Sequence, residues 1–254
     1  MAELPRVEAY RRLIEGHCKG KTIALVQGDS DLLVDISMPQ LRAKLLKQKI
    51  GAVYRHGKML FVALGKGKGF LVLHFGPEGY PAPDADPALS PLCVFSLGFH
   101  DASFLWIINE RRIGEIGWTA NKEKLIEERG YGPDALIITE KQFLDNVRKR
   151  RSAIKAVLMN QDVTAGIGNA YADEILFRAG LHPHLPMRMI TTEMLRKLWQ
   201  EMRAVLSEAI EGKAEHHFFV LNRKAGQPCP HCHTLTKQKY VQGRSTYFCP
   251  SCQP

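Results

Sequence analysis

Residues 164–183 read T-A-G-I-G-N-A-Y-A-D-E-I-L-F-R-A-G-L-H-P, a glycine turn followed by a helix. Gly166 and Gly168 give a turn with little steric restriction, and Asn169 can cap the helix that follows. Glycine and proline end the helix, and its apolar face is formed by Tyr171, Ile175 and Leu176. A helix start offers free N–H groups and the positive end of the dipole, so this turn can bind a phosphate. It can equally be a tight turn between two packed helices.

The chain as a whole is basic. Its 254 residues include 35 Lys and Arg against 26 Asp and Glu, a formal net charge of +9. This surplus favours a polyanionic partner such as nucleic acid. No apolar run approaches the roughly 18 to 20 residues of a membrane span, and the first residues lack the layout of a secretion signal. We therefore expect a cytoplasmic protein without membrane contact, associated with the nucleoid if its source is bacterial.

Four of the six cysteines fall in the last 26 residues, as two C-x2-C pairs separated by sixteen residues. In a cytoplasmic chain this clustering argues for metal rather than for disulfides. Two such pairs offer four thiolates from two tight turns, which suits a closed tetrahedral zinc site. A closed site has no open position for water, so the metal would shape the chain and take no part in chemistry. The sequence predicts one structural Zn²⁺ held by Cys229, Cys232, Cys249 and Cys252, with His231 and His233 as bystanders.

Periodicity divides the chain into a β-rich half and a helical half. Residues 4–18 have a helical apolar pattern, and residues 22–118 contain mostly short strands broken by glycine and proline. The strand spacing is that of a β-sandwich or a barrel. Charge and glycine increase at 127–133, where we place a domain boundary, and a capping-box pair, Thr139 with Gln142, opens the helical part.

Two basic features have two interpretations each. The segment between the cysteine pairs can form a hairpin with Gly243 at its turn and Arg244 exposed at the tip. A guanidinium there can meet a phosphate or a groove, or it can be an ordinary surface arginine. The run R-K-R-R at 148–151 can be a solvated face, or it can meet phosphates.

Three features together resemble the formamidopyrimidine-DNA glycosylase and endonuclease VIII family. They are the glycine turn and helix, the finger ending G-R-S-T-Y-F-C-P-S-C-Q, and the opening M-A-E-L-P-R-V-E with H-G-K at 56–58. The resemblance covers nearly the whole chain and implies an α+β fold. It implies an N-terminal helix and β-sandwich catalytic domain at 1–128, a helix–two-turns–helix domain at 134–213 and a zinc finger at 222–254. It also implies a monomer that binds double-stranded DNA containing damaged bases or abasic sites, with the damaged nucleotide flipped out.

The resemblance further implies Schiff-base chemistry from the N-terminal amine once Met1 is removed. An α-amine has an unperturbed pKa of about 7.7 to 8.0 against about 10.4 for lysine, so more of it is neutral near pH 7. It attacks the sugar C1′ and expels the base, and the Schiff base then permits strand cleavage by elimination. Matching the family's motifs position by position gives the catalytic residues Ala2, Glu3 and Lys58. The same matching gives the DNA-binding residues Lys155, Asn169, Arg244, Arg111, Ile113 and Pro77.

The chain departs from the family pattern at several of these positions. Ala2 replaces a proline, Arg6 a carboxylate, Pro77 a methionine and Ile113 a phenylalanine, and the segment 212–229 is short. A primary amine can still form a Schiff base, so the leading hypothesis is a base-excision-repair DNA glycosylase with AP lyase activity. The second hypothesis is a family member that binds damaged or distorted DNA without cleaving it. A third is a zinc-ribbon protein that serves RNA or a protein partner.

Overall fold

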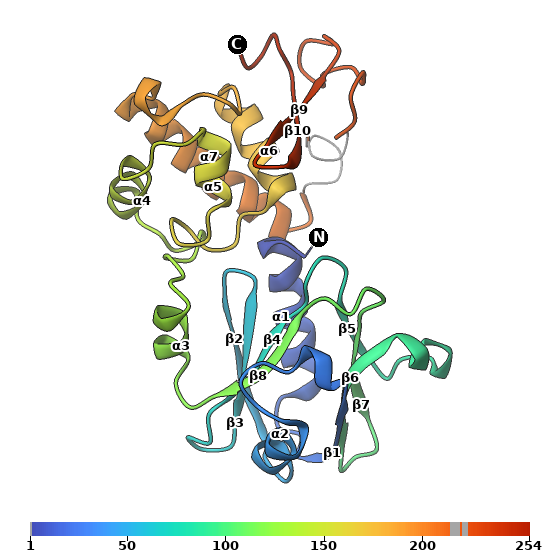
Figure 1. Cartoon of the computed structure of the whole chain (residues 1–254). Helices are drawn as coiled ribbons and strands as arrows, with labels where there is room; N and C mark the ends of the chain where they lie inside the picture. Colours follow the sequence, from blue (N-terminus) through green and yellow to red (C-terminus); the bar gives the residue numbers. More distant parts are fainter. Residues whose placement is uncertain (1, 214–218, 220–222) are drawn as a thin grey trace. The chain divides into compact units, whose positions relative to one another are not determined.

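The computed structural model describes residues 2–213, 219 and 223–254. The chain forms two compact units (Figure 1). The N-terminal unit contains Ala2 and Arg6–Arg129, and the C-terminal unit contains Glu3–Pro5 and Gly130–Pro254. None of the helices in these described ranges has the length and apolar character that a membrane crossing requires.

The N-terminal unit is a β-sandwich of two four-stranded antiparallel sheets, as predicted. One sheet has the order β1-β6-β7-β5 and the other has the order β2-β3-β4-β8 (Figure 1). The strands are β1 Ile23–Gly28, β2 Ile50–His56, β3 Met59–Leu64, β4 Phe70–His74, β5 Tyr80–Pro83, β6 Cys93–Phe99, β7 Phe104–Ile108 and β8 Glu115–Thr119. The helices are α1 Leu4–Cys18, η1 Ser30–Leu32, α2 Met38–Leu45, η2 Pro87–Leu92 and α3 Lys122–Glu128.

The central strand β3 explains why the sequence M-L-F-V-A-L is apolar throughout. Leu60, Val62 and Leu64 join the large apolar core of the sandwich. Phe61, which is fully buried, packs edge-on against Phe70, with ring centroids 6.4 Å apart. A strand that is covered on both faces needs apolar residues at every position rather than at alternate ones.

The C-terminal unit is helical and ends in a β-hairpin. Its elements are α4 Glu140–Arg148, α5 Ile154–Met159, α6 Asn169–Ala179, η3 Met187–Met189, α7 Thr192–Ile210, β9 Lys237–Val241 and β10 Arg244–Phe248. Thr139 and Gln142 form the predicted capping box at the start of α4. The hairpin lies against α6 (Figure 1).

These elements confirm the α+β fold and the first helix, whose bounds are as predicted. One local prediction is wrong: Gly168, and not Asn169, is the N-cap of α6, and it makes no side-chain bond. Gly180 ends that helix in the left-handed conformation at φ 71°, as expected of a C-terminal glycine. The three-domain division stays a prediction. Met1 and residue 222, the predicted start of the finger, lie outside the described residues.

Candidate functional site

The carboxylate of Glu3 binds the start of α6. The backbone N–H groups of Gly168, Ala170 and Tyr171 donate to its two oxygens at 2.9, 2.8 and 3.1 Å. Glu3 is only 2% exposed. A Cβ added at Gly168 would come within 2.3 Å of the Glu3 carboxyl carbon, so glycine is required there for the acid to approach. The first free N–H groups of the helix are therefore satisfied by a side chain 165 residues away in sequence.

This contact identifies the ligand of the glycine turn, for which a phosphate site was one of two open interpretations. The helix start does bind an anion, as its N–H groups and dipole predict. However, the anion is the carboxylate of Glu3 rather than a phosphate of a partner. The N–H of Asn169 is not among the three that Glu3 binds.

The same turn also holds the residue that follows Glu3. The Leu4 N–H donates to the Gly166 carbonyl at 3.2 Å, and Leu4 is fully buried in the core of the helical unit. Gly166 has φ 119°, and a Cβ there would lie 2.4 Å from a Leu4 methyl carbon. Ala2, which directly precedes Glu3, is 5% exposed. The backbone next to the predicted nucleophile is therefore fixed by contacts on both following residues.

A buried charge network lies beside this turn. Lys155 and Asp173 are both fully buried, and the Lys155 Nζ lies 2.6 Å from an Asp173 oxygen. The Arg223 Nε binds the other Asp173 oxygen at 2.8 Å. Burial lowers the pKa of the Lys155 ammonium, and the adjoining carboxylate of Asp173 opposes that shift. Burial raises the pKa of Asp173, and the two cations oppose it.

The network fixes strand β10 of the hairpin. The Lys155 ammonium donates to the Thr246 hydroxyl at 2.8 Å. The Ser245 carbonyl accepts from Asn169 Nδ2 at 2.9 Å and from Arg223 Nη2 at 3.2 Å. A fully buried ammonium cannot touch a phosphate without moving, so any role of Lys155 in DNA binding would be exerted through this strand.

Arg244 stands at the exposed end of the hairpin. It is the first residue of β10, after a two-residue turn in which Gln242 and Gly243 have φ 48° and 72°. Positive φ at both positions is typical of the type I′ turn of a tight hairpin. Arg244 is exposed, and its guanidinium has no hydrogen bond or ion pair with any described residue, whereas its backbone carbonyl accepts from the Thr246 hydroxyl at 3.1 Å. Its guanidinium is therefore free to meet a ligand.

The four cysteines of the C-terminal segment form a metal site. Their sulfur atoms all lie within 4.8 Å of one another. Three of the sulfur–sulfur separations are 3.4, 3.5 and 3.8 Å, close to the edge of about 3.8 Å expected for a tetrahedron with Zn–S bonds of about 2.3 Å. Cys229, Cys232, Cys249 and Cys252 therefore fit one structural Zn²⁺. His231 lies against the Phe177 ring instead, so it is a bystander as predicted.

In the N-terminal unit, His74 lies near Lys58. Lys58 lies half-buried in the turn between β2 and β3, next to Met59, which pairs across the sheet with His74. Burial lowers the pKa of His74, Lys58 and Arg129 lower it further, and Glu115 opposes them. Sequence reasoning missed His74, although a histidine at the end of the apolar run F-L-V-L-H was a visible signal.

Two loops of the same unit bring together the other predicted DNA-binding residues. The Asn109 side-chain amide donates to the Phe75 carbonyl at 3.2 Å and to the Ile113 carbonyl at 2.7 Å. This places the half-buried Pro77 loop against the loop that carries Arg111 and Ile113. Ile113 is 51% exposed, and Arg111 pairs with Glu78 at 3.0 Å. An exposed isoleucine beside a proline offers an apolar wedge.

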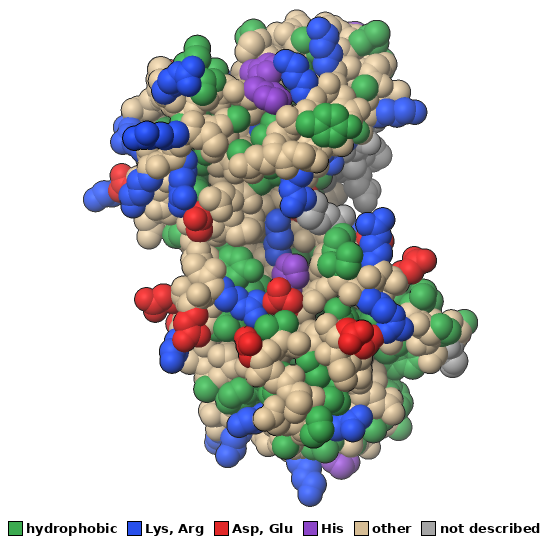
Figure 2. All heavy atoms as spheres, in the orientation of Figure 1, with side chains coloured by type: hydrophobic (Ala, Val, Ile, Leu, Met, Phe, Trp, Pro, Cys, Tyr) green, Lys and Arg blue, Asp and Glu red, His purple; other side chains and the backbone are tan. Residues whose placement is uncertain are grey.

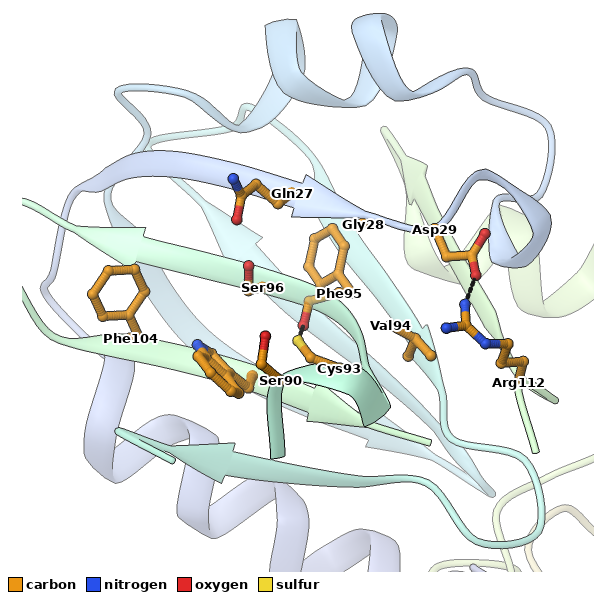
Figure 3. Close-up of a pocket in the computed structure, with 11 residues that line it drawn as sticks. Gln27, Gly28, Asp29, Ser90, Cys93, Val94, Phe95, Ser96, Phe104 and Arg112 are labelled. Carbon is orange, nitrogen blue, oxygen red and sulfur yellow. Dashed lines mark hydrogen bonds and ion pairs between the residues drawn. The ribbon is translucent and has the colours of Figure 1, made fainter. Parts of the chain in front are cut away.

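A separate hollow of about 380 Å³ lies on the β1-β6-β7-β5 sheet (Figure 3). Its two charged residues, Asp29 and Arg112, bind each other. The Cys93 thiol donates to the Phe95 carbonyl at 3.3 Å, and burial raises its pKa, which disfavours the thiolate. None of the predicted site residues lines this hollow, so it does not belong to the candidate site.

The fold and these residues define a protein of two units that carries a zinc finger and an exposed arginine-tipped hairpin. Family models match along the chain: the formamidopyrimidine-DNA glycosylase N-terminal domain at residues 1–116, its H2TH domain at 130–219, and the zinc finger found in FPG and IleRS at 226–254. The chain belongs to the formamidopyrimidine-DNA glycosylase family.

Similar proteins support this assignment. The formamidopyrimidine-DNA glycosylase of Chloroflexus aurantiacus is 32% identical over all of this chain and 98% of its own length. That of Geobacillus kaustophilus is 31% identical over the full length of both. Two solved structures each have 26% identity and cover 99% of both chains: MutM in complex with DNA containing carbocyclic 8-oxo-G, with a TM-score of 0.88, and Lactococcus lactis Fpg bound non-covalently to AP-site DNA, with a TM-score of 0.89.

Proposed function

We propose that this protein is a base-excision-repair DNA glycosylase with AP lyase activity, acting on double-stranded DNA with damaged bases or abasic sites. Family membership supports this, as do solved relatives that hold DNA with an 8-oxo-G analogue or an AP site. The observation that carries the proposal is the anchoring of Glu3 at the start of α6. That anchor fixes the beginning of the chain next to Asn169, whose side chain holds the arginine-tipped hairpin.

The reaction begins with the neutral α-amine of Ala2. Its lone pair forms a bond to C1′ of the extruded nucleotide, and the glycosidic bond breaks as the base leaves with the bonding electrons and takes up a proton. Opening of the sugar then gives a Schiff base between C1′ and the nitrogen, which acidifies the C2′ proton and permits loss of the 3′ phosphate by elimination. An α-amine suits this step because its pKa is about two units or more below that of a lysine.

The other residues have supporting roles in this proposal. Both oxygens of Glu3 already accept N–H bonds, so it positions Ala2, and its negative charge favours the cationic Schiff base. Lys58 assists at the reacting sugar. Asn169 and Arg244 bind backbone phosphates, which fix register without reading sequence. Pro77 and Ile113, beside Arg111, fill the gap that the extruded nucleotide leaves in the duplex.

Arg6 is the residue that we expect to alter the range of lesions. It is exposed in the first turn of α1, a turn that contains no acidic residue. A cation there opposes the helix dipole, so stability does not explain the residue. A guanidinium near Ala2 donates hydrogen bonds where a carboxylate would accept them. Comparing Arg6→Glu with the wild type over oxidised purines, oxidised pyrimidines, alkylated bases and abasic sites tests this, and an unchanged ranking of substrates would contradict it.

Borohydride trapping tests the proposed chemistry. Reduction in the presence of a short abasic duplex converts the Schiff base into a stable amine, so protein with a free Ala2, verified by N-terminal mass, should become covalently attached to DNA. Protein that retains Met1 is the matched control and should give no adduct, because its amine lies one residue out of position. Absence of an adduct from the verified Ala2 form, with binding intact, would favour the alternative of a non-cleaving binder.

We also propose a cytoplasmic, nucleoid-associated monomer, because the substrate is chromosomal DNA and the predicted site needs one chain. Sedimentation of the protein with and without abasic duplex tests the stoichiometry. A complex with two protein chains on one lesion would contradict it.

A further inference from the structure

A second basic site lies on the helical unit, away from the residues used so far. A pocket of about 340 Å³ is lined by Arg148, Arg150, Arg151 and Arg188 together with Thr192, over an apolar floor that includes Leu195. Lys and Arg side chains gather over the α4 side of this unit in Figure 2. Every charged residue that lines the pocket is an arginine, which suits an anionic ligand.

The backbone brings these arginines together from two parts of the chain. The Ile154 N–H donates to the Leu185 carbonyl at 2.9 Å, and the Met187 N–H donates to the Ser152 carbonyl at 3.3 Å. This short antiparallel ladder places the end of the R-K-R-R run beside Arg188. The basic run therefore forms one wall of a pocket rather than a solvated helix face alone.

Two of the arginines are held in place and two are free. The Arg148 guanidinium donates to the Thr192 hydroxyl at 2.7 Å, and Arg150 pairs with Asp162 at 3.1 Å. Arg151 and Arg188 are exposed, and neither has a hydrogen bond or ion pair with another residue in the described ranges. Two fixed and two unpaired guanidiniums around one hollow leave a strong uncompensated positive charge, which a phosphate would neutralise with hydrogen bonds of good geometry.

We propose that this pocket binds a backbone phosphate of the DNA that flanks the lesion, several base pairs from it. The inference rests on the proposed function, because it takes lesion-containing duplex as the ligand. Position supports a flanking segment. Arg151 is four residues before Lys155, which touches the arginine-tipped strand, and four residues span at most about 14 Å. With the reach of two side chains of about 7 Å each added, the pocket is within about 28 Å, or about eight base pairs at about 3.4 Å per pair, of the phosphates at the arginine-tipped strand.

The test compares the Arg151→Ala/Arg188→Ala double variant with wild type on two duplexes carrying a non-cleavable abasic analogue. One duplex has about 10 base pairs centred on the lesion, so it extends about five pairs to either side and stops short of a phosphate about six to eight pairs away, and the other has about 40. On the long duplex the salt dependence of binding should weaken by about one in log–log slope, because the one phosphate contact of the pocket is lost. On the short duplex the two proteins should bind alike. Arg151→Lys/Arg188→Lys should keep the long-duplex slope.

Matched controls separate this proposal from folding and from the proposed function. Arg196→Ala on α7 removes an exposed arginine that pairs with Glu140, and it should leave both slopes unchanged. Borohydride trapping on a duplex of the same short length that carries a true abasic site reports the proposed chemistry independently of the pocket. The proposal is overturned if the salt slope of the double variant falls equally on both duplexes, or if it falls on neither. If the wild type forms no covalent adduct, the result counts against the catalytic function. The comparison of binding to the short and the long duplex can still be interpreted in that case.

Discussion

The β-sandwich and the zinc hairpin are stabilised in different ways. The sandwich has a large apolar core to which all of its long strands contribute, with Leu60, Leu71 and Phe95 among its fully buried residues. The hairpin has little apolar core: four of the five residues of β9 are exposed, and the adjoining cluster has Phe177 and Phe219 as its only buried aromatic residues in the described ranges. Metal ligands and buried charges take the place of that core.

This difference bears on function. The hairpin carries Arg244, and its position depends on Zn²⁺ and on the Lys155–Asp173–Arg223 network rather than on apolar burial. The sandwich should therefore tolerate changes that displace the hairpin. The predictions that follow use this contrast, beginning with the change of largest expected effect.

Removal of the metal should unfold the hairpin and leave the sandwich folded. Structural zinc contributes an apparent binding free energy of about 10 kcal/mol or more, far beyond what this small cluster of apolar residues can replace. Chelation should abolish binding to lesion duplex while hydrogen exchange in β3 and β4 stays slow. Restoration of binding by added Zn²⁺ is the control, and unchanged affinity in metal-free protein would contradict the assignment.

Lys155→Met should destabilise the hairpin by about 3 to 5 kcal/mol, because it leaves the Asp173 carboxylate with one buried partner fewer. Hydrogen exchange should accelerate in β10 and stay unchanged in the sandwich. The double variant Lys155→Met/Asp173→Leu should destabilise the hairpin less than the single change, since it removes both buried charges. Lys141→Met, on the exposed surface of α4, is the matched control. A single variant as stable as wild type would show that the network does not hold the strand.

Arg244→Ala should weaken binding to every duplex sequence by about tenfold and lower the salt slope by about one, because one charged phosphate contact is lost. The fold should be unaffected, since the Arg244 guanidinium has no bonded partner among the described residues and its backbone contacts remain in the alanine variant. Gln238→Ala on the neighbouring strand is the control for changes in the hairpin surface. A loss confined to particular sequences would mean that Arg244 reads bases.

Acid should destabilise the sandwich modestly through His74. Its pKa in the folded protein lies below the ordinary value of about 6.5, so the unfolded chain takes up the proton first as pH falls. The stabilisation is complete above about pH 7 and declines as pH falls through 6.5 toward the folded pKa. Urea midpoints at pH 7 and 5.5 should differ less in His74→Gln than in wild type. Both measurements use a Trp199→Phe background, in which the fluorescence of Trp106 and Trp118 reports unfolding of this unit. If the urea midpoint depends equally on pH with and without His74→Gln, the role of His74 is contradicted.

Much of the architecture was predictable because it is encoded locally. The apolar periodicity of the first helix, the capping pair at Thr139 and the glycine turn at Gly243 each depend on neighbours a few residues away. The cysteine spacing similarly predicted the metal site, since both halves of that site are short turns.

The buried polar contacts were not predictable in the same way. Lys155 was predicted only as a DNA-binding residue, and its partners in the fold are Asp173 and a hydroxyl 91 residues away. Similarly, Glu3 reads as an ordinary acid near the chain start, and nothing in its neighbours indicates a bond to α6. The pocket at Arg188 likewise exists only because an antiparallel ladder joins two distant segments.

The sequence by itself determined the order of helices and strands, the four metal ligands and the family, because periodicity, turn chemistry and spacing act over short stretches. Only the tertiary structure decided which anion occupies the start of α6 and which cations are free for DNA. A charged group is satisfied by whichever opposite charge the fold brings within about 3 Å, and that partner can lie anywhere along the chain. Here the Glu3 carboxylate binds the start of α6, and Asp173 pairs with Lys155 and Arg223. Three arginines remain exposed: Arg151, Arg188 and Arg244.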